Sequence, residues 1–316
     1  MKTVILDAGT LGDDVDLWVF GKFGEVEIFE RTDPADVAAR IADADFAVLN
    51  KVKMNRDTVG EANKLKLVCV AATGYDNIDL PFMRSRGTGV CNVAGYSTDS
   101  VAQLTAAMAL SLLTNLPSFT SYVADGSYSR GASANCLTPV YHEIAGKIWG
   151  IVGYGNIGRK VGEIARALGC RVIVNKRTPT ADAECVTIDA LCETADIISV
   201  HTPLTEETRG LISRARIAKM KSGAVVINVA RGAVCDEAAL CEAVRDGRIG
   251  GIGVDVYSSE PFREDSPYYA IRQMPNVCLT PHMAWGSHEA RVRCVSEMAL
   301  NIESFLEGGT RSRVDI

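Results

Sequence analysis

The sequence has 316 residues and a mass of 33.9 kDa, which favours two domains at roughly 150 residues each. Apolar residues make up 47% and charged residues 23%, so disordered, fibrous and collagen-like proteins are excluded. Lys and Arg number 33 against 39 Asp and Glu, and the net charge of −6 argues against nucleic acid or an anionic membrane as a partner.

The start of the chain and the cysteines indicate the compartment. The first apolar stretch is too short for a signal sequence and is interrupted by Asp7, and no run approaches the ~18 apolar residues of a membrane span. The ten cysteines are scattered without a C-x-x-C pair, and the chain has only four histidines, so we expect no metal site. We predict a reduced cytoplasmic protein in which most cysteines are small buried apolar residues.

Short strands rich in Val and Ile alternate with helical stretches over the first third of the chain. The predicted helices are 34–44 and 56–64, with Asp33 and Asn55 as N-caps. The predicted strands are 3–6, 26–29, 46–49, 67–70 and 90–91. Strands that alternate with helices indicate a parallel α/β sheet.

The longest helical pattern, 98–114, lies in the middle of the chain and ends before Pro117. The polar stretch 118–136 that follows is predicted to be irregular. A long loop inside a compact domain is usually functional or part of an interface, and the alternative here is a surface excursion.

Stronger strands resume near residue 148 and continue almost to the end of the sequence. They are 148–152, 171–174, 196–200, 224–229, 251–256 and 277–279, and a helix over 287–307 follows. Near-continuous Val and Ile runs are typical of central parallel strands buried on both faces. The sequence therefore predicts two α/β domains, each built on a parallel sheet.

A glycine-rich turn, G-x-G-x-x-G, lies between the strand at 148–152 and a helical stretch at 159–168. Gly153 allows a tight turn, Gly155 lets the backbone approach a pyrophosphate, and Gly158 permits close packing of the helix on the strand. The free amides and the positive end of the helix would hold the diphosphate. The turn therefore predicts a dinucleotide site.

The residues after the strand at 171–174 predict which dinucleotide binds. An NAD site favours an acidic side chain there, but the sequence has Asn175, Lys176 and Arg177, with no Asp or Glu between Glu163 and Asp182. A carboxylate would repel the 2′-phosphate of NADP, whereas the two cations would pair with it. We predict NADP(H), with NAD(H) and two solvent-facing cations as the alternative.

Charged side chains and histidines follow the ends of four predicted strands: Arg231, Glu260, His282 and His201. Ligands of open α/β sheets bind at the carboxyl ends of the strands, which is also where the glycine turn lies. A histidine beside a carboxylate can supply a proton, and an arginine can bind a substrate carboxylate through its planar fork. This set suits hydride transfer to a carbonyl carbon coupled to protonation of its oxygen.

Of the histidines, His282 is predicted to be the acid/base. It lies between Pro281 and a segment of small residues, whereas His201 precedes Thr202-Pro203 and is expected only to contact the cofactor. His142 and His288 lie on polar stretches and are not expected to take part.

Seven segments then carry a family resemblance: 71–79, 92–103, the glycine turn 153–158, 201–205, 228–232, 253–261 and 280–285. In these motifs the whole chain resembles the D-isomer-specific 2-hydroxyacid dehydrogenases, most closely the glycerate dehydrogenase/hydroxypyruvate reductase branch. The resemblance implies hydride transfer between a nicotinamide cofactor and a small 2-oxo acid/D-2-hydroxy acid pair, hydroxypyruvate or glyoxylate to D-glycerate or glycolate. The alternatives are a D-lactate-type or aromatic 2-oxo acid reductase, or a cofactor-gated binding protein without turnover.

The resemblance also implies roles for individual residues. The catalytic set would be Arg231, Glu260 and His282, and Asp255 would meet the nicotinamide carboxamide. The substrate residues would be Lys51, Thr73, Gly74 and Arg231. Asn175 and Lys176 depart from the commonest pattern of the family, in which many members carry an acidic residue there. Taken together with the residues of the glycine turn and of the segment after the strand at 171–174, the predicted cofactor residues are Thr98, Gly153, Tyr154, Gly155, Asn156, Ile157, Gly158, Asn175, Lys176, Arg177, His201, Thr202, Pro203, Val229, Ala230, Asp255 and Trp285.

Finally, the resemblance implies the domain organisation. A flavodoxin-like substrate domain would comprise residues 1–97 and 287–316, with a Rossmann-type cofactor domain, 98–286, inserted into it. The active site is expected in the cleft between the two. The helix and loop over 98–145 are expected to form a homodimer interface.

Overall fold

The computed structural model describes residues 1–316, and the chain divides into two compact units. The terminal unit comprises Met1–Ser97 and Trp285–Ile316, and the central unit is Thr98–Ala284. The chain returns to the terminal unit two residues earlier than predicted. The reason is that the Trp285 ring packs edge-on against Tyr96, with ring centroids 6.3 Å apart, and joins the core of the terminal unit.

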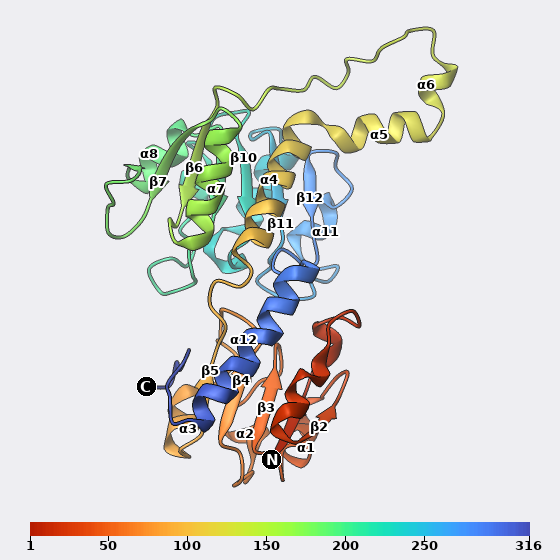
Figure 1. Ribbon diagram of the computed structural model, residues 1–316. Coiled ribbons are helices and arrows are strands. Elements are labelled where there is room, and N and C mark those ends of the chain that lie inside the picture. The colour runs from red at the N-terminus through yellow and green to blue at the C-terminus, as the bar shows by residue number, and fades with distance from the viewer. The chain divides into compact units, whose positions relative to one another are not determined.

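The terminal unit is built on a five-stranded parallel sheet with the order β2-β1-β3-β4-β5 (Figure 1). The strands are β1 (Lys2–Ile5), β2 (Glu25–Ile28), β3 (Phe46–Leu49), β4 (Leu67–Val70) and β5 (Gly89–Cys91). Along β3, Phe46 and Val48 belong to one apolar cluster and Ala47 and Leu49 to another, as the two-residue period of a strand requires. Both faces of the sheet are therefore buried.

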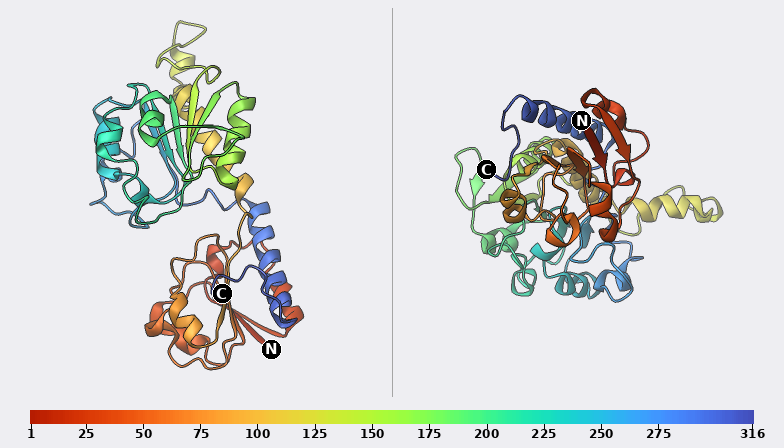
Figure 2. Two further views of the ribbon diagram at one scale, coloured as in Figure 1. Left: turned by 90° about the vertical axis from the view of Figure 1, so that its left-hand side faces the viewer. Right: turned by 90° about the horizontal axis from the view of Figure 1, so that it is seen from below.

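Helices cover the two faces of this sheet. The long C-terminal helix α12 (His288–Leu306) packs on one face through Ala290, Cys294, Met298 and Ile302, which recur at helical spacing (Figures 1 and 2). The other elements are η1 (Ala8–Thr10), η2 (Leu17–Phe23), η3 (Pro34–Asp36), α1 (Val37–Arg40), α2 (Arg56–Val59) and α3 (Leu80–Ser85).

The two predicted helices of the first third are shorter than expected. The stretch 34–44 splits into η3 and α1, and the stretch 56–64 keeps only α2. Asn55 does cap α2, since its side chain accepts from the amides of Asp57 and Thr58. The helix then ends at Gly60, where a φ of +56° breaks the helical path.

The central unit is built on a seven-stranded parallel sheet with the order β12-β11-β10-β9-β6-β7-β8. The strands are β6 (Ile148–Val152), β7 (Arg171–Asn175), β8 (Glu184–Cys185), β9 (Ile197–Val200), β10 (Val225–Asn228), β11 (Gly251–Val254) and β12 (Val277–Leu279). The order runs outward from β6 in both directions, so the topological switch point lies between β6 and β9. Ligands of doubly wound folds bind at this place.

Helices cover both faces of the central sheet as well. On one face, α4 (Thr98–Thr114) packs beside α7 (Asn156–Ala167), and a Cβ at Gly253 of β11 would lie 3.1 Å from Met108 of α4. On the other face lie α8 (Ile188–Thr194), α9 (Arg214–Ile217), η4 (Gly232–Val234), α10 (Glu237–Arg245) and α11 (Pro267–Ile271). The predicted fold class, two doubly wound parallel-sheet units, is confirmed.

The prediction of an irregular stretch over 118–136 is wrong as far as residue 130 and holds only for 131–136. Two further helices, α5 (Leu116–Ala124) and α6 (Ser127–Arg130), project from the sheet of the central unit (Figures 1 and 2). Asn115 adopts a left-handed φ of 49°, which ends α4, and Pro117 stands in the first turn of α5, where its missing N–H costs nothing. The segment contains many Ser and Thr residues, whose low helix propensity gives the sequence no clear helical signal.

No helix of the chain combines the length and the apolar character that crossing a membrane requires. All ten cysteines are free, and seven of them are buried, as small apolar core residues would be.

Candidate active site

The glycine turn lies at the carboxyl end of β6, beside the switch point of the central sheet. A Cβ at Gly153, whose φ is +90°, would lie 2.6 Å from the Thr202 amide nitrogen, and a Cβ at Gly158 would lie 2.1 Å from the Gly153 carbonyl oxygen. Nothing lies within 4 Å of the corresponding position at Gly155, which precedes the first turn of α7. The turn is therefore packed at two glycines and open at the third, and it fits a diphosphate held against the N-terminus of a helix.

His201 follows β9 on the other side of the switch point. Its amide donates to the Val152 carbonyl oxygen at 2.7 Å, which keeps the ends of β6 and β9 together. Both ring nitrogens are buried without a hydrogen-bond partner in the chain, and burial lowers the pKa of the imidazole to about 3. A neutral ring with two unused polar atoms fits a ligand-contacting residue and excludes His201 as a proton donor near neutral pH.

The segment after β7 was predicted to select the cofactor. The Asn175 side chain donates to the Val186 carbonyl oxygen at 3.0 Å, so it braces the chain beyond β8. Lys176 is half-buried and Arg177 is exposed. A hydrogen bond from Thr205 and, more weakly, the charge of Arg177 lower the pKa of Glu207, so Arg177 has one acidic neighbour.

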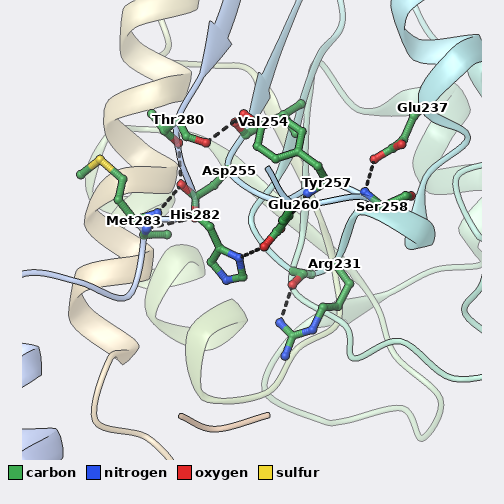
Figure 3. A network of polar contacts seen from close by, with 12 residues as sticks. Arg231, Glu237, Val254, Asp255, Tyr257, Ser258, Glu260, Thr280, His282 and Met283 are labelled. Atoms are coloured by element: carbon green, nitrogen blue, oxygen red, sulfur yellow. Dashed lines mark hydrogen bonds and ion pairs between the residues drawn. The ribbon is translucent and has the colours of Figure 1, made fainter. Parts of the chain in front are cut away.

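His282 and Glu260 meet at the carboxyl ends of β12 and β11. The His282 Nδ1 and the Glu260 Oε2 atoms are 2.6 Å apart, and the Glu260 Oε1 atom accepts from the Tyr257 amide at 3.0 Å (Figure 3). Each oxygen of the Glu260 carboxylate therefore has a partner, His282 for Oε2 and the Tyr257 amide for Oε1. A carboxylate at this distance fixes the orientation of the ring.

The loop that carries His282 is tied down by a buried carboxylate. His282 has a left-handed φ of +53°, a strained conformation for a residue with a side chain. Asp255 is fully buried, and its oxygens accept from the Thr280 hydroxyl and from the amides of Met283 and Ala284 at 2.6–2.9 Å. The Tyr257 hydroxyl also donates to the Thr280 carbonyl oxygen at 2.8 Å. These contacts hold the strained residue from both sides.

Arg231 follows β10, the neighbour of β11 in the sheet. Asn228, which is buried, donates to the Arg231 carbonyl oxygen at 2.9 Å and accepts from the Ala230 amide at 3.1 Å, and these bonds fix the turn. The guanidinium donates to the Ala230 carbonyl oxygen at 2.7 Å. Arg231, Glu260 and His282 thus lie at the carboxyl ends of three adjacent strands (Figure 3).

Three of the four predicted substrate residues, Lys51, Thr73 and Gly74, lie in the terminal unit, where a second carboxylate holds a loop. Asp7 accepts from the amides of Asn50, Lys51 and Val52 at 2.8, 2.6 and 3.2 Å. Burial raises the pKa of this carboxyl, and the three amide bonds oppose the shift. Thr73 is held through its carbonyl oxygen, which accepts from the Asn92 side chain at 2.7 Å.

Sequence reasoning missed Asp7, although a usable signal existed. It lies two residues after the end of β1, so the rule that drew attention to Arg231 and Glu260 applies to it as well.

The structure brings some predicted residues together and not others. Within the central unit, the glycine turn, Thr202, Val229, Ala230 and Asp255 all follow ends of neighbouring strands, and Thr98 begins α4. Lys51, Thr73, Gly74 and Trp285 belong to the terminal unit. Trp285 was predicted within the central domain, and its packing on Tyr96 corrects that assignment.

Comparisons with known proteins give the family of the chain. Residues 106–284 match the family model described as "D-isomer specific 2-hydroxyacid dehydrogenase, NAD binding domain". A hydroxypyruvate reductase of Blautia hydrogenotrophica is 33% identical over 317 residues, which cover 98% of each chain. A glycerate dehydrogenase of Methylorubrum extorquens is 33% identical over 315 residues and 99% of each chain.

Among solved structures, an acyclic imino acid reductase in complex with NADPH and D-arginine has a TM-score of 0.85 and 29% identity, over 99% of this chain and 100% of that one. The family match spans more than half of the chain, and the relatives match nearly all of it. The chain belongs to the D-isomer-specific 2-hydroxyacid dehydrogenases, oxidoreductases that use a nicotinamide cofactor and act on a CH–OH group.

Proposed function

We propose that the protein reduces a small 2-oxo acid, with hydroxypyruvate and glyoxylate as the first candidates, to the D-2-hydroxy acid. The observation that carries the proposal is the 2.6 Å contact between His282 and Glu260 at the strand ends beside Arg231. Two relatives, a hydroxypyruvate reductase and a glycerate dehydrogenase, support this choice of substrate.

In this proposal the proton comes from His282. Its Nδ1 atom faces Glu260, so Nε2 is the atom that donates to the carbonyl oxygen. The nicotinamide, when bound, supplies the hydride to the carbonyl carbon, and hydride plus proton convert the C=O group to CH–OH. Arg231 binds the substrate carboxylate and polarises the carbonyl.

A panel of 2-oxo acids tests the activity. Hydroxypyruvate and glyoxylate are expected to be reduced with kcat/KM at least tenfold above pyruvate and aromatic 2-oxo acids. A preference for pyruvate or an aromatic acid would favour the D-lactate-type or aromatic alternatives. Tight cofactor binding without turnover on any acid would favour the binding-protein alternative.

We also propose a preference for NADP(H). The support is the run Asn175-Lys176-Arg177, which lacks a carboxylate to repel a 2′-phosphate, and the NADPH held by the similar imino acid reductase. Kinetics with both reduced cofactors test it: we expect a lower KM for NADPH, and Lys176→Ala with Arg177→Ala should raise that KM about tenfold while leaving the KM for NADH nearly unchanged. A tenfold or greater preference for NADH would contradict the proposal.

The segment 98–145 is proposed to form a homodimer interface. Leu116, Val123, Leu137 and Val140 are each more than half exposed, which is unusual for large apolar side chains gathered on one segment. Light scattering should give the mass of a dimer for the wild type and of a monomer for Leu137→Asp/Val140→Asp. Trp18→Asp, an equally exposed apolar position in the terminal unit, is the control and should leave the mass unchanged.

The free cysteines further support a reducing compartment, the cytoplasm.

A further inference from the structure

A second carboxylate, that of Glu237 in helix α10, contacts the loop that carries Glu260. Two consecutive amides of this loop point at two different acids: the Tyr257 amide donates to Glu260 at 3.0 Å, and the Ser258 amide donates to the Glu237 Oε1 atom at 2.8 Å (Figure 3). Glu237 is half-buried and lies 21 residues from its partner along the chain. Its contact therefore links α10 to the loop at the end of β11.

The same carboxylate lies against the segment that carries Arg231. A Cβ at Gly232 would lie 2.7 Å from the Glu237 Oε1 atom, 2.2 Å from the Ser258 amide nitrogen and 2.2 Å from the Tyr257 carbonyl carbon. Only a residue without a side chain fits there. Glu237 thus lies where the backbone after Arg231 meets the backbone before Glu260.

We propose that Glu237 is a positioning residue that, by holding the Ser258 amide, reserves the Glu260 carboxylate for His282. Without this acceptor, two neighbouring amides compete for Glu260, and the carboxylate turns from the imidazole toward the loop. The inference rests on the proposed roles of Glu260 and His282 and adds a residue that touches neither substrate nor cofactor.

The charged surroundings of Glu237 are consistent with this role. Burial raises the pKa of its carboxyl, the bonds to Ser258 oppose that shift, and the charge of Glu260 adds to it. The other titratable groups that sense Glu237 are the buried thiols of Cys235 and Cys241 and the buried Tyr268, and burial keeps all three in their neutral forms. Glu260 is therefore the one charged group of the site that interacts electrostatically with Glu237.

Three substitutions separate the hydrogen bond from the charge. Glu237→Gln keeps an oxygen acceptor and removes the charge, Glu237→Asp keeps the charge and withdraws the oxygen, and Glu237→Ala removes both. We expect kcat to fall about tenfold in the Asp and Ala variants and to stay within about twofold in the Gln variant. The KM of the cofactor should not change, and the pH profile of kcat/KM should lose its high-pH side earlier in the two impaired variants.

The matched control is Glu242→Gln on the same helix, which removes only an exposed ion pair with Arg214. It should leave kcat and the pH profile unchanged. A loss of kcat in the Gln variant with an unimpaired Asp variant would show that the charge matters rather than the hydrogen bond, and unchanged kcat in folded Asp and Ala variants would show that Glu237 is only structural. Either result overturns the proposal.

A readout without turnover separates this inference from the proposed function. The proton shared by His282 Nδ1 and Glu260 should give a far-downfield NMR resonance, which should persist in Glu237→Gln and broaden or vanish in Glu237→Asp. If the wild type reduces no 2-oxo acid, the proposed activity fails, and this resonance still decides whether Glu237 holds the pair. Its persistence in all three variants would refute the positioning role.

Discussion

Two histidines follow parallel strands of the same sheet, and their surroundings give them opposite chemistry. His201, after β9, has both ring nitrogens buried without a partner, and burial lowers its pKa to about 3. His282, after β12, is partly open to solvent and has Glu260 2.6 Å from its Nδ1 atom. Position at a strand end therefore brings a side chain to the site, but the partner of the ring decides whether it can move a proton.

Replacing His282 is expected to have the largest effect. His282→Ala should lower kcat about 10³-fold, since it removes the proton donor, while the dissociation constant of the cofactor stays within about twofold. Nicotinamide fluorescence measures binding, and steady-state oxidation of the reduced cofactor measures turnover. His288→Ala, at an exposed ion pair with Asp14, is the control. Wild-type turnover in His282→Ala would contradict the proposed role of His282 as the proton donor.

Removing the charge beside His282 tests why the two histidines differ. Glu260→Gln keeps the size of the side chain but offers a neutral amide to Nδ1, so we expect kcat to fall about 10²-fold. Glu264→Gln, on the same loop and bonded only to the Tyr269 hydroxyl, should be neutral. Wild-type kcat in a folded Glu260→Gln enzyme would show that Glu260 does not act on the ring.

The sequence was sufficient to predict most strands and the three catalytic candidates, but not all of the helices. Continuous apolar runs gave strands such as β3, β4 and β6 their observed bounds, and Arg231, Glu260 and His282 could be found because each follows such a run. The helix at 56–64 was predicted too long and the helix at 116–124 was missed, because backbone reversals at Gly60 and Asn115 decide where these two helices end and begin. The stretch 34–44 was predicted as one helix, whereas it divides into η3 and α1.

The neighbours of the site could not be predicted in the same way. Asp7, Glu237 and Tyr257 act through backbone amides and carbonyl groups that are 21 to 45 residues away or belong to another strand, as in the contacts of Glu237 with Ser258 and of Asp7 with Val52. A sequence pattern records which side chains follow a strand but not which amides they meet. The burial that separates His201 from His282 is likewise a property of the packed sheet.

The burial of His201 predicts that the protein loses stability as the pH falls. Its folded-state pKa of about 3 lies below the 6.5 of a free histidine, so between these values the unfolded chain binds a proton that the folded chain does not. This contribution to stability is present above pH 6.5 and is lost as the pH falls, by up to ~1.4 kcal/mol per pH unit, or ~2 kcal/mol by pH 5. Urea unfolding at pH 7 and pH 5 measures it, with Trp149 of the central unit as the fluorophore after replacement of Trp18 and Trp285 by Phe. His201→Gln should reduce the loss and His288→Gln should not; an unchanged loss in His201→Gln would contradict the burial of an unpaired ring.

The smallest expected effect comes from the far side of the His282 loop. Tyr257→Phe removes the hydroxyl that donates to the Thr280 carbonyl oxygen but keeps the ring, which packs against Phe262 and Tyr268 with centroids 4.7 and 5.4 Å away. The Tyr257 amide still holds Glu260, and Asp255 still holds the loop through three bonds, so we expect kcat to fall only about threefold. Tyr269→Phe, whose hydroxyl contacts only the exposed Glu264, should leave kcat unchanged. A loss in Tyr257→Phe as large as that of Glu260→Gln would mean that the strained backbone of His282 depends on this one hydroxyl, and that positioning of the ring counts as much as the charge beside it.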